Sequence, residues 1–178
     1  MKATIRKESL ASLKELSQKE QEKKLLEDKI LADLFQSSLW LESSVIATTL
    51  SMPIEFNTEK LIEKALEEGK IIGVPKTFGK GQMAFFNYKT GDELERTTFG
   101  VLEPVKEELI TKDKIDLLIV PGVAFNDSGF RVGFGGGFYD RYLADYSGET
   151  CSLVFPQQLN NEFDPESHDL AVAKIFTI

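Results

Sequence analysis

The sequence predicts a single α/β domain over residues 1–178, in three layers, with a mostly parallel central sheet flanked by helices. Three observations support this fold class. Short apolar runs rich in β-branched residues recur along the chain, amphipathic helical segments alternate with them, and no repeat or low-complexity linker interrupts them. A chain of 178 residues holds one sizeable core, whereas two independent domains would each be cramped.

Residues 3–38 have the pattern of two amphipathic helices. Ser17, followed three residues later by Glu20, is typical of a capping box that restarts a helix. Leucines and other apolar residues mark the buried faces: Leu10, Leu13 and Leu16 in the first helix, and Leu26, Ile30, Leu34 and Phe35 in the second. We interpret the remaining charges as a solvated face: Lys19, Glu20, Glu22, Lys23, Lys24, Glu27 and Asp28.

A strand, a helix and a second strand follow within about thirty residues. Residues 45–50 are apolar and β-branched, as in a central strand. Thr58 has the features of an N-cap, and the helical stripe that follows ends at Gly69. Residues 71–74 form the next strand, which we expect Pro75 to stop. This order predicts a parallel crossover unit.

The second half of the chain predicts further strands and one helix. Residues 76–104 read as irregular, with short strands around 84–88. Residues 116–120 form the clearest buried strand, which Pro121 and Gly122 end. Helical character follows at 138–146, and closing strands are expected at 153–155 and 172–176. The arrangement is Rossmann-like.

Composition excludes several classes of function. With 29 acidic and 21 basic residues the net charge is −8, which opposes nonspecific nucleic-acid binding. The apolar runs are too short to span a bilayer, and the N-terminus lacks an apolar signal segment, so we expect a cytoplasmic protein. One cysteine, Cys151, and one histidine, His168, exclude an intrachain disulfide, a thiolate cluster and a multi-histidine site. We expect Cys151 to be a core residue.

The segment from Val120 to Tyr142 carries the strongest functional signal. It follows the clearest strand at its carboxyl end, where open α/β sheets usually bind ligands. Four glycines remove side chains that would keep a phosphate chain from the backbone: Gly133, Gly135, Gly136 and Gly137. Arg131 offers a forked set of donors for phosphate, and Asp140 a hard oxygen ligand for a metal. We expect the helix beginning near Phe138 to add its N-terminal amides.

Two familiar phosphate-binding motifs do not fit this segment. The chain contains no G-x-x-x-x-G-K-[ST] string. A dinucleotide fingerprint that starts at Gly133 would require glycine at position 138, which is phenylalanine. A tight surface turn is the alternative interpretation, but adjacent glycines cost backbone entropy without a return in packing, which favours a functional loop.

Five separated segments resemble one known family. Arg131–Asp140, preceded by Pro121–Phe125, resembles the signature of the 5-formyltetrahydrofolate cyclo-ligase family, also called methenyltetrahydrofolate synthetases. The family resemblance extends over nearly the whole chain, in segments that occur in the same order: Lys2–Arg6, Leu50–Thr58, Phe99–Pro104 and Glu166–Asp169.

The resemblance implies an ATP- and Mg²⁺-dependent ligase that converts 5-formyltetrahydrofolate to 5,10-methenyltetrahydrofolate and releases ADP and phosphate. It implies that the formyl oxygen attacks the γ-phosphate of ATP, and that ring closure then expels phosphate. Reduced folate and ATP would be the partners of a monomer or weak homodimer in one-carbon metabolism.

The resemblance also implies a set of site residues. Arg131 and Tyr139 would be catalytic, and Asp140 and Asp169 would hold the metal. ATP would be bound by Lys2, Ala3, Thr4, Ile5, Arg6, Arg131, Val132, Gly133, Phe134, Gly135, Gly136, Gly137, Phe138 and Tyr139. The folate would be bound by Arg6, Leu50, Glu55, Phe134, Gly135, Gly136, Gly137 and Phe138.

The chain departs from the family pattern at two positions. Many relatives carry arginine at the position of Phe134 and lysine at the position of Gly136, so these positions supply no charge here. We therefore expect phosphate neutralisation to depend on Lys2, Arg6, Arg131 and the metal, with Lys76 as an additional contributor.

Several alternatives stay open from the sequence. Lys2 and Arg6 have the position of frayed surface residues, and Glu55 that of a solvated residue before a helix. We expect His168 to be a partner of Asp169 rather than an acid or base. Phe85, Phe86 and Tyr88 either wall the pterin ring or pack in the core. The competing functions are a sugar-phosphate isomerase or CoA-transferase-like enzyme, and a nucleotide- or folate-binding module without turnover.

Overall fold

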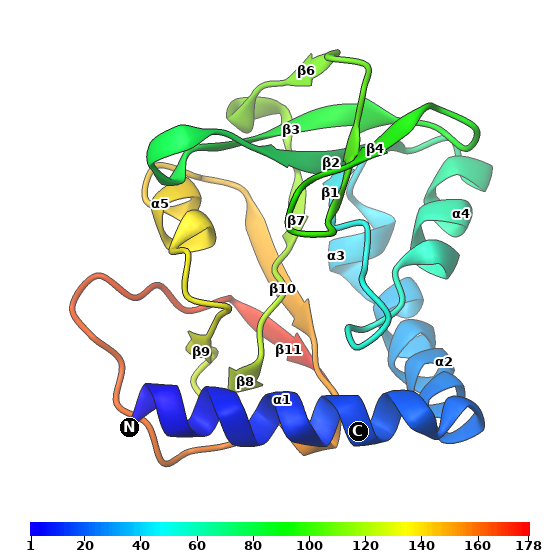
Figure 1. Cartoon of the computed structure of the whole chain (residues 1–178). Coiled ribbons are helices and arrows are strands. Elements are labelled where there is room, and N and C mark those ends of the chain that lie inside the picture. Colours follow the sequence, from blue (N-terminus) through cyan, green and yellow to red (C-terminus); the bar gives the residue numbers. More distant parts are fainter.

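The computed structural model describes all residues, 1–178, as one α/β fold with a seven-stranded sheet (Figure 1). In spatial order the strands are β11 (Lys174–Phe176), β10 (Glu149–Leu153), β7 (Leu117–Ile119), β1 (Val45–Ala47), β2 (Ile71–Thr77), β3 (Met83–Tyr88) and β6 (Leu109–Ile110). The first five are parallel, whereas β3 and β6 are antiparallel to their neighbours. The predicted mostly parallel sheet is confirmed.

Helices cover both faces of the sheet because successive side chains of each strand point to opposite sides. Ile46 and Leu117 face a core formed with α1 (Lys2–Gln18), α2 (Glu20–Gln36), α3 (Ser38–Leu41) and α4 (Glu59–Glu67). Ala47 and Leu118 face the opposite core, where α5 (Phe138–Leu143) supplies Tyr142 and Leu143. The fold therefore has three layers: helices α1 to α4, the central sheet, and helix α5, with one core on each face of the sheet.

The predicted crossover is confirmed, because β1 and β2 pair in parallel and α4 connects them. The chain moves from β1 to β2 on one side and later returns to β7 on the other side of β1. The strand order therefore reverses between β1 and β7, and ligands of open α/β sheets usually bind outside such a point. In Figure 1, α1 lies along this carboxyl edge of the sheet.

Two boundary predictions were wrong. Ser17 does not form a capping box: its hydroxyl donates to the carbonyl of Lys14 at 2.6 Å, and α2 starts after Lys19 without a side-chain cap. Pro75 does not stop β2, which continues to Thr77. Since β1 pairs with β2 only as far as Gly73, the rest of β2 has β3 as its ladder partner, and a residue without an amide is tolerated there.

The predicted solvated face of α2 was wrong at two positions. Lys23 and Glu27 are buried, and their side chains form an ion pair at 2.8 Å. They lie on the same helical stripe as Ile30 and Leu34, at spacings of four, three and four residues. Burial against the rest of the fold, rather than side-chain polarity, decides their environment.

Short elements complete the structure. They are the hairpin of β4 (Leu94–Arg96) and β5 (Leu102–Pro104), the hairpin of β8 (Ala124–Phe125) and β9 (Arg131–Val132), and the 3₁₀ turns η1 (Gly79–Gly81), η2 (Lys112–Lys114) and η3 (Pro156–Gln158). Cys151 lies inside β10 and is fully buried, as predicted for a core residue. None of the helices combines the length and apolarity that a membrane crossing would require.

Candidate functional site

The glycine-rich segment is held beside the N-terminal helix by a small apolar cluster. After β7 the chain forms the β8–β9 hairpin, in which the amide of Val123 donates to the carbonyl of Val132 at 2.8 Å. Ile5 of α1 packs with Ala124, Val132 and Phe163. The side chains of Ile5 and Val132 therefore anchor the segment, and a ligand could meet these two residues only through their backbone.

This anchoring places two basic residues of α1 at the segment. Arg6 Nε donates to the carbonyl oxygen of Gly133 at 2.8 Å, and Lys2 Nζ donates to Asp169. Residues 2 to 6 form the first turns of α1, so the alternative of a frayed end is wrong. Ala3 and Thr4 are exposed on the outer side of this helix.

The loop itself is open and conformationally special. Gly135 and Gly137 adopt φ of +107° and +69°, which residues with a side chain rarely adopt. A Cβ at Gly133 would meet only Arg131, at 3.7 Å, whereas one at Gly136 would lie 2.6 Å from the ring of Phe138. Phe134 to Gly137 are exposed to solvent. The following α5 has six residues, so its dipole contributes less than we expected.

Arg131 is the charged centre of the site. Its side chain is 6% exposed, and its Nη2 lies 3.5 Å from Asp140 Oδ1. Its guanidinium lies 5.7 Å from the ring centroid of Tyr139. Burial lowers the pKa of Arg131, while the negative charges of Asp140 and Asp169 oppose this shift. Arg131 therefore lies in the field of both predicted metal ligands.

Buried donors without a protein partner gather at this centre. Arg131 Nε and Tyr139 Oη are both inaccessible to solvent, and neither has a hydrogen-bond partner within the chain. Burial, and then the negative charge of Glu55, raise the pKa of Tyr139, so its phenol stays protonated near neutral pH and keeps a hydrogen to donate. Unsatisfied buried polar groups are rare, and a ligand that supplies acceptor oxygens would satisfy both donors.

Asp169 is the second acidic residue of the site. Partial burial raises its pKa, but hydrogen bonds from Lys2 and from the amide of Glu166 outweigh burial, so the net shift is downward. His168 Nε2 lies 3.5 Å from Asp169 Oδ1, consistent with the predicted partner role. The carboxylate is thus ionised and surrounded by cations.

The residues present fit a magnesium ion that is shared with a substrate. Nowhere in the chain do three or more His, Cys, Asp or Glu side chains converge on one point. Asp140 and Asp169 offer hard oxygen atoms, which is what Mg²⁺ prefers. Mg²⁺ usually takes one or two carboxylates and completes its shell with water and phosphate oxygens, so two carboxylates beside the glycine-rich loop would suffice.

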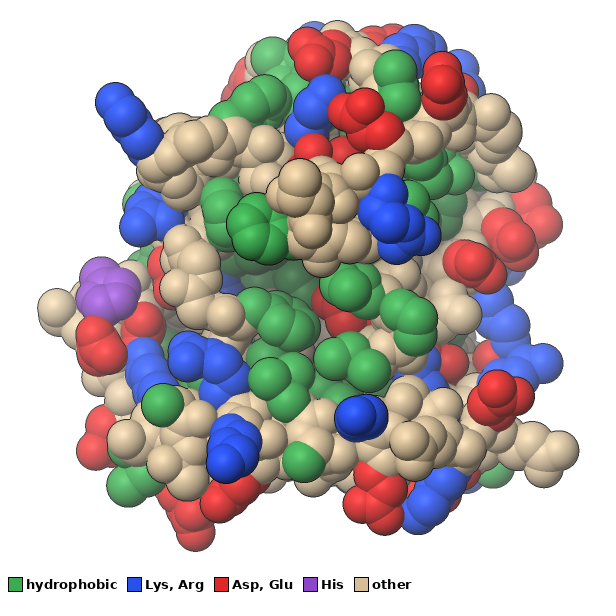
Figure 2. All heavy atoms as spheres, viewed as in Figure 1, with side chains coloured by type: hydrophobic (Ala, Val, Ile, Leu, Met, Phe, Trp, Pro, Cys, Tyr) green, Lys and Arg blue, Asp and Glu red, His purple; other side chains and the backbone are tan.

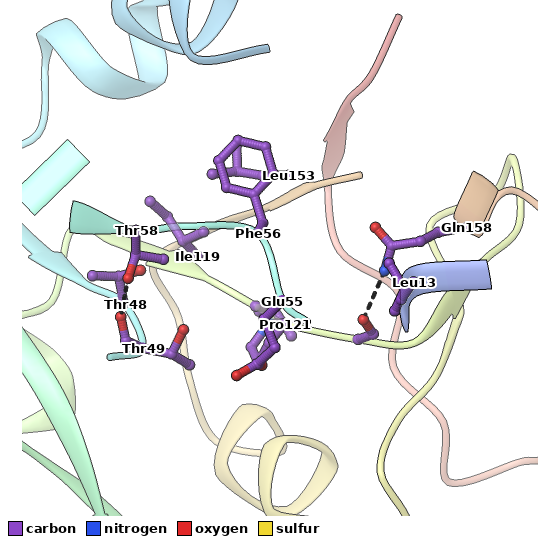
Figure 3. Close-up of a pocket in the computed structure, with 12 residues that line it drawn as sticks. Leu13, Thr48, Thr49, Glu55, Phe56, Thr58, Ile119, Pro121, Leu153 and Gln158 are labelled. Carbon is purple, nitrogen blue, oxygen red and sulfur yellow. Dashed lines mark hydrogen bonds between the residues drawn. The ribbon is translucent and has the colours of Figure 1, made fainter. Parts of the chain in front are cut away.

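A pocket lies next to this centre, at the carboxyl ends of β1, β7 and β10. Figure 2 shows a hollow in this face, lined mainly by hydrophobic side chains, with basic side chains grouped along the ridge beside it. Figure 3 shows the lining, which includes Leu13, Ile119, Pro121 and Leu153 among the apolar residues and Thr48, Glu55 and Gln158 among the polar ones.

Glu55 is the carboxylate of this pocket. Its Oε1 accepts a hydrogen bond from the amide of Met52 at 2.7 Å, which leaves the second oxygen for a ligand. Burial raises the pKa of Glu55, although the Met52 amide and the positive charge of Lys23 oppose the shift. Gly122 lines the pocket, and a Cβ built on it would lie 3.3 Å from Arg131 Cδ, so the pocket adjoins the start of the glycine-rich segment. Glu55 is half-buried rather than fully solvated.

Other predicted residues have different environments. Lys76 pairs with Glu107 at 3.1 Å and with Glu95 at 3.9 Å, so its charge is already neutralised. Phe85 and Phe86 are buried in the core, and Phe85 packs edge-on against Tyr139 at 6.5 Å between centroids. Leu50 is half-buried against the core beside the pocket.

The sequence prediction missed two polar residues of the pocket. Thr48 is fully buried and its Oγ1 has no hydrogen-bond partner. Nothing in the sequence distinguished it, because it lies in a run of β-branched and apolar residues that reads as an ordinary strand. Gln158 donates to the carbonyl oxygens of Gly122 and Val123 and accepts from the amide of Phe155, which holds η3 against the end of β7.

Comparison with known proteins identifies the family. The model of the 5-formyltetrahydrofolate cyclo-ligase family matches residues 1–178. The 5-formyltetrahydrofolate cyclo-ligase of Escherichia coli K12 is 32% identical over 139 residues, which cover 74% of this chain and 76% of the relative. The mouse enzyme of the same name is 29% identical over 147 residues, 75% of this chain and 72% of the relative.

A solved structure agrees with these relatives. The structure of 5,10-methenyltetrahydrofolate synthetase from Aquifex aeolicus superposes with a TM-score of 0.85 at 28% identity, and covers 98% of this chain and 88% of that one. The glycine-rich segment, the acidic pair around Arg131 and the pocket of Glu55 lie on this shared fold. The chain belongs to the 5-formyltetrahydrofolate cyclo-ligase family.

Proposed function

We propose that the chain catalyses the ATP- and Mg²⁺-dependent conversion of 5-formyltetrahydrofolate to 5,10-methenyltetrahydrofolate, with release of ADP and phosphate. The observation that carries this proposal is the pair of buried, unpartnered donors, Arg131 Nε and Tyr139 Oη, between the glycine-rich segment and the pocket of Glu55. One side of this pair suits a phosphate chain and the other suits a planar heterocycle. A transferred phosphoryl group would lie between them.

The nucleotide side supplies charge and backbone donors. Arg6 and Arg141 donate to the carbonyl oxygens of Gly133 and Gly136, both at 2.8 Å, and Arg131 lies beside Gly133. Lys2 adds a positive charge at Asp169, and the open backbone at Gly133 would admit a phosphate. Asp140 and Asp169 would hold Mg²⁺, which neutralises phosphate charge when bound. Arg131 and Lys2 now pair with these carboxylates, so nucleotide binding would exchange these ion pairs for contacts with phosphate oxygens.

The folate side supplies an apolar pocket with one carboxylate. The pterin ring carries adjacent N–H donors on its edge, and the free oxygen of Glu55 can accept from them. Leu50, Phe56 and Leu153 provide apolar surface for the ring faces. Burial of Glu55 strengthens such a charge-assisted hydrogen bond because little water competes.

The reaction then needs alignment more than reactive side chains. The formyl oxygen attacks the γ-phosphate and ADP leaves. The neighbouring folate nitrogen then attacks the activated carbon, that nitrogen loses its proton, and phosphate departs. Arg131 and Tyr139 would stabilise the charge that develops on the transferred group. Burial raises the pKa of Cys151 to about 12, so its thiol offers no nucleophile, and the mechanism requires none.

An absorbance assay tests the proposal. Protein, ATP, Mg²⁺ and 5-formyltetrahydrofolate are mixed, and the methenyl product is followed by its ultraviolet absorbance while ADP is quantified. Equal amounts of both products are expected. Binding of ATP and folate without product would instead identify a module without turnover, and absence of folate binding would refute the folate assignment. Fractionation of the source cells would test the cytoplasmic location.

A further inference from the structure

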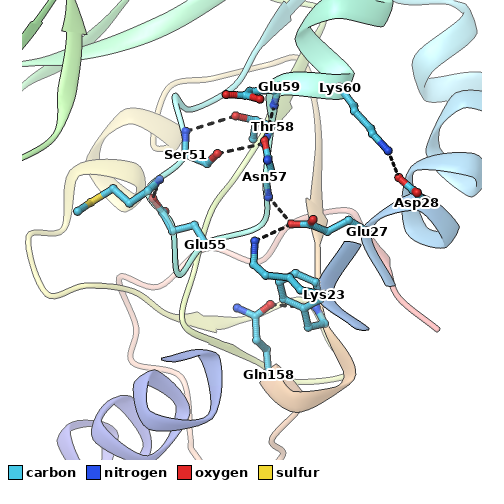
Figure 4. A network of polar contacts seen from close by, with 12 residues as sticks. Lys23, Glu27, Asp28, Ser51, Glu55, Asn57, Thr58, Glu59, Lys60 and Gln158 are labelled. Carbon is cyan, nitrogen blue, oxygen red and sulfur yellow. Dashed lines mark hydrogen bonds and ion pairs between the residues drawn. The ribbon is translucent and has the colours of Figure 1, made fainter. Parts of the chain in front are cut away.

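The loop that carries Glu55 is attached to α2 by a buried pair of charges (Figure 4). Lys23 Nζ donates to Glu27 Oε2 at 2.8 Å, and the same oxygen accepts the backbone amide of Asn57 at 2.6 Å. The two side chains are 11% and 9% exposed. Glu27 therefore connects the helix to the loop through a charge-assisted hydrogen bond.

Internal hydrogen bonds make this loop, residues 48–58, a rigid unit. Thr58 Oγ1 donates to the carbonyl of Thr49 at 2.7 Å, and the amide of Thr58 donates to Ser51 Oγ at 3.1 Å. Two hydrogen bonds join Glu55 to Met52: the amide of Glu55 donates to the carbonyl of Met52, and the amide of Met52 donates to the carboxylate of Glu55. A movement of Asn57 relative to α2 would therefore displace Glu55 with it.

Stability alone does not account for the buried pair. Along a helix, lysine followed four residues later by glutamate is the weaker order of an ion pair. Taking both charges out of water is costly, and apolar residues of similar volume often replace such pairs without loss of stability. The pair is better explained by what it positions.

Lys23 has a second effect, on the carboxylate of the pocket. Its ammonium lies 5.8 Å from the ring of Phe155, which packs on Phe56 next to Glu55. Its positive charge acts on Glu55 and opposes the effect of burial. The other groups that face Glu55 are the amide of Met52 in the same loop and the phenol of Tyr139 on α5.

We propose that Lys23 and Glu27 are positioning residues for the folate half of the site: the pair fixes loop 48–58 on α2 and holds the Glu55 carboxylate in place for the pterin edge. This inference rests on the proposed function. It assigns a substrate-specific role to a helix that does not line the nucleotide side.

The test compares two polar bridges that both start from α2, one to loop 48–58 and one to α4. The variant Lys23→Met/Glu27→Leu removes both buried charges without leaving either one unpaired, so it should fold. The control Asp28→Leu/Lys60→Met removes the neighbouring bridge from α2 to α4, which is exposed. We expect the KM for 5-formyltetrahydrofolate to rise about 10-fold or more in the first variant, since small misplacements of a binding group cost this much, with the KM for ATP unchanged within twofold. The control should keep both values.

A pH profile separates positioning from general loosening. Without Lys23, burial acts on Glu55 unopposed by that charge, so the pKa of Glu55 rises further. The acidic limb of kcat/KM for the folate should then move to higher pH in Lys23→Met, and Lys23→Arg should restore the position of the limb. Equal losses toward ATP and folate, or a folded double variant with the native folate KM, would overturn the positioning role. Wild-type protein without turnover would instead overturn the proposed function.

Discussion

Replacing Arg131 with methionine tests the centre of the proposed site. The substitution keeps most of the side-chain volume and removes the guanidinium, whose Nη2 lies 3.5 Å from Asp140. At an effective dielectric constant of about 20, that separation corresponds to an attraction of about 5 kcal/mol before desolvation is counted. Burying a guanidinium also costs several kcal/mol, but the substitution leaves Asp140, which is 22% exposed, without this cation, so we expect a net loss of stability of about 2 kcal/mol.

The effect on turnover should be much larger than the effect on stability. Arg131 has a buried donor without a protein partner, and removal of one preorganised donor to a developing charge typically costs about 10²- to 10³-fold in kcat, or about 3–4 kcal/mol. We expect kcat of Arg131→Met to fall by that factor while the folate KM changes little. Methenyl absorbance under saturating substrates measures kcat, and thermal unfolding measures stability.

A matched substitution controls for the loss of a positive charge. The ammonium group of Lys112, in the turn η2, lies over the ring of Tyr142 and pairs with Asp145. The variant Lys112→Met should keep native turnover. A folded Arg131→Met protein with near-native kcat would refute the reasoning, because the orphaned donor would then have no catalytic partner. Equal losses in both variants would also refute it.

Three further substitutions probe the remaining parts of the site. Asp140→Asn should raise the Mg²⁺ concentration needed for half-maximal turnover about 10-fold, measured by metal titration. Gly133→Ala should raise the KM for ATP about 10-fold with little change in stability, because its Cβ meets only Arg131 at 3.7 Å in the protein but enters the path of a phosphate. Thr48→Val should raise thermal stability by about 1 kcal/mol, because it removes a buried hydroxyl without a partner, yet weaken folate binding in calorimetry.

Each of these substitutions has a control or a refuting result. Asp145→Asn removes an exposed carboxylate just after the C-terminal end of α5, and it should leave the Mg²⁺ requirement unchanged. Gly79→Ala adds a methyl group to open space and should leave the KM for ATP unchanged. A destabilised Thr48→Val protein would mean that the hydroxyl has a partner within the fold. Valine at Gly136 would be a poorer probe, because its Cβ would displace Phe138.

The local pattern of apolar residues predicted the helices and strands well where their spacing fitted only one type of element. The apolar run before Pro121 became β7, the stripe after Thr58 became α4, and the order of strand, helix and strand fixed a parallel crossover. It failed where tertiary contacts decide. Pro75 was tolerated because β2 has a single ladder partner there, and the stripe that contains Ile30 and Leu34 also carried Lys23 and Glu27 into the interior.

The candidate site divides in the same way. Glycine content, a guanidinium and acidic residues in order along the chain indicated the phosphate-binding segment. Local residue pattern could not place Lys2 and Arg6 beside it, and only the family resemblance did so, because their position depends on Ile5 packing with Val132 across more than a hundred residues. It also gave no reason to single out Thr48, whose significance comes from burial without a partner.

The sequence by itself determined the α/β class and the parallel crossover, and it singled out the glycine-rich segment that we propose to bind phosphate, because residue type and local spacing set backbone conformation and the chemistry of nearby groups. The tertiary structure alone decided which charges are buried, which donors lack partners, and that the pocket of Glu55 adjoins Arg131 and Tyr139. Those properties depend on the exclusion of water by residues distant in the chain, and no local pattern encodes it.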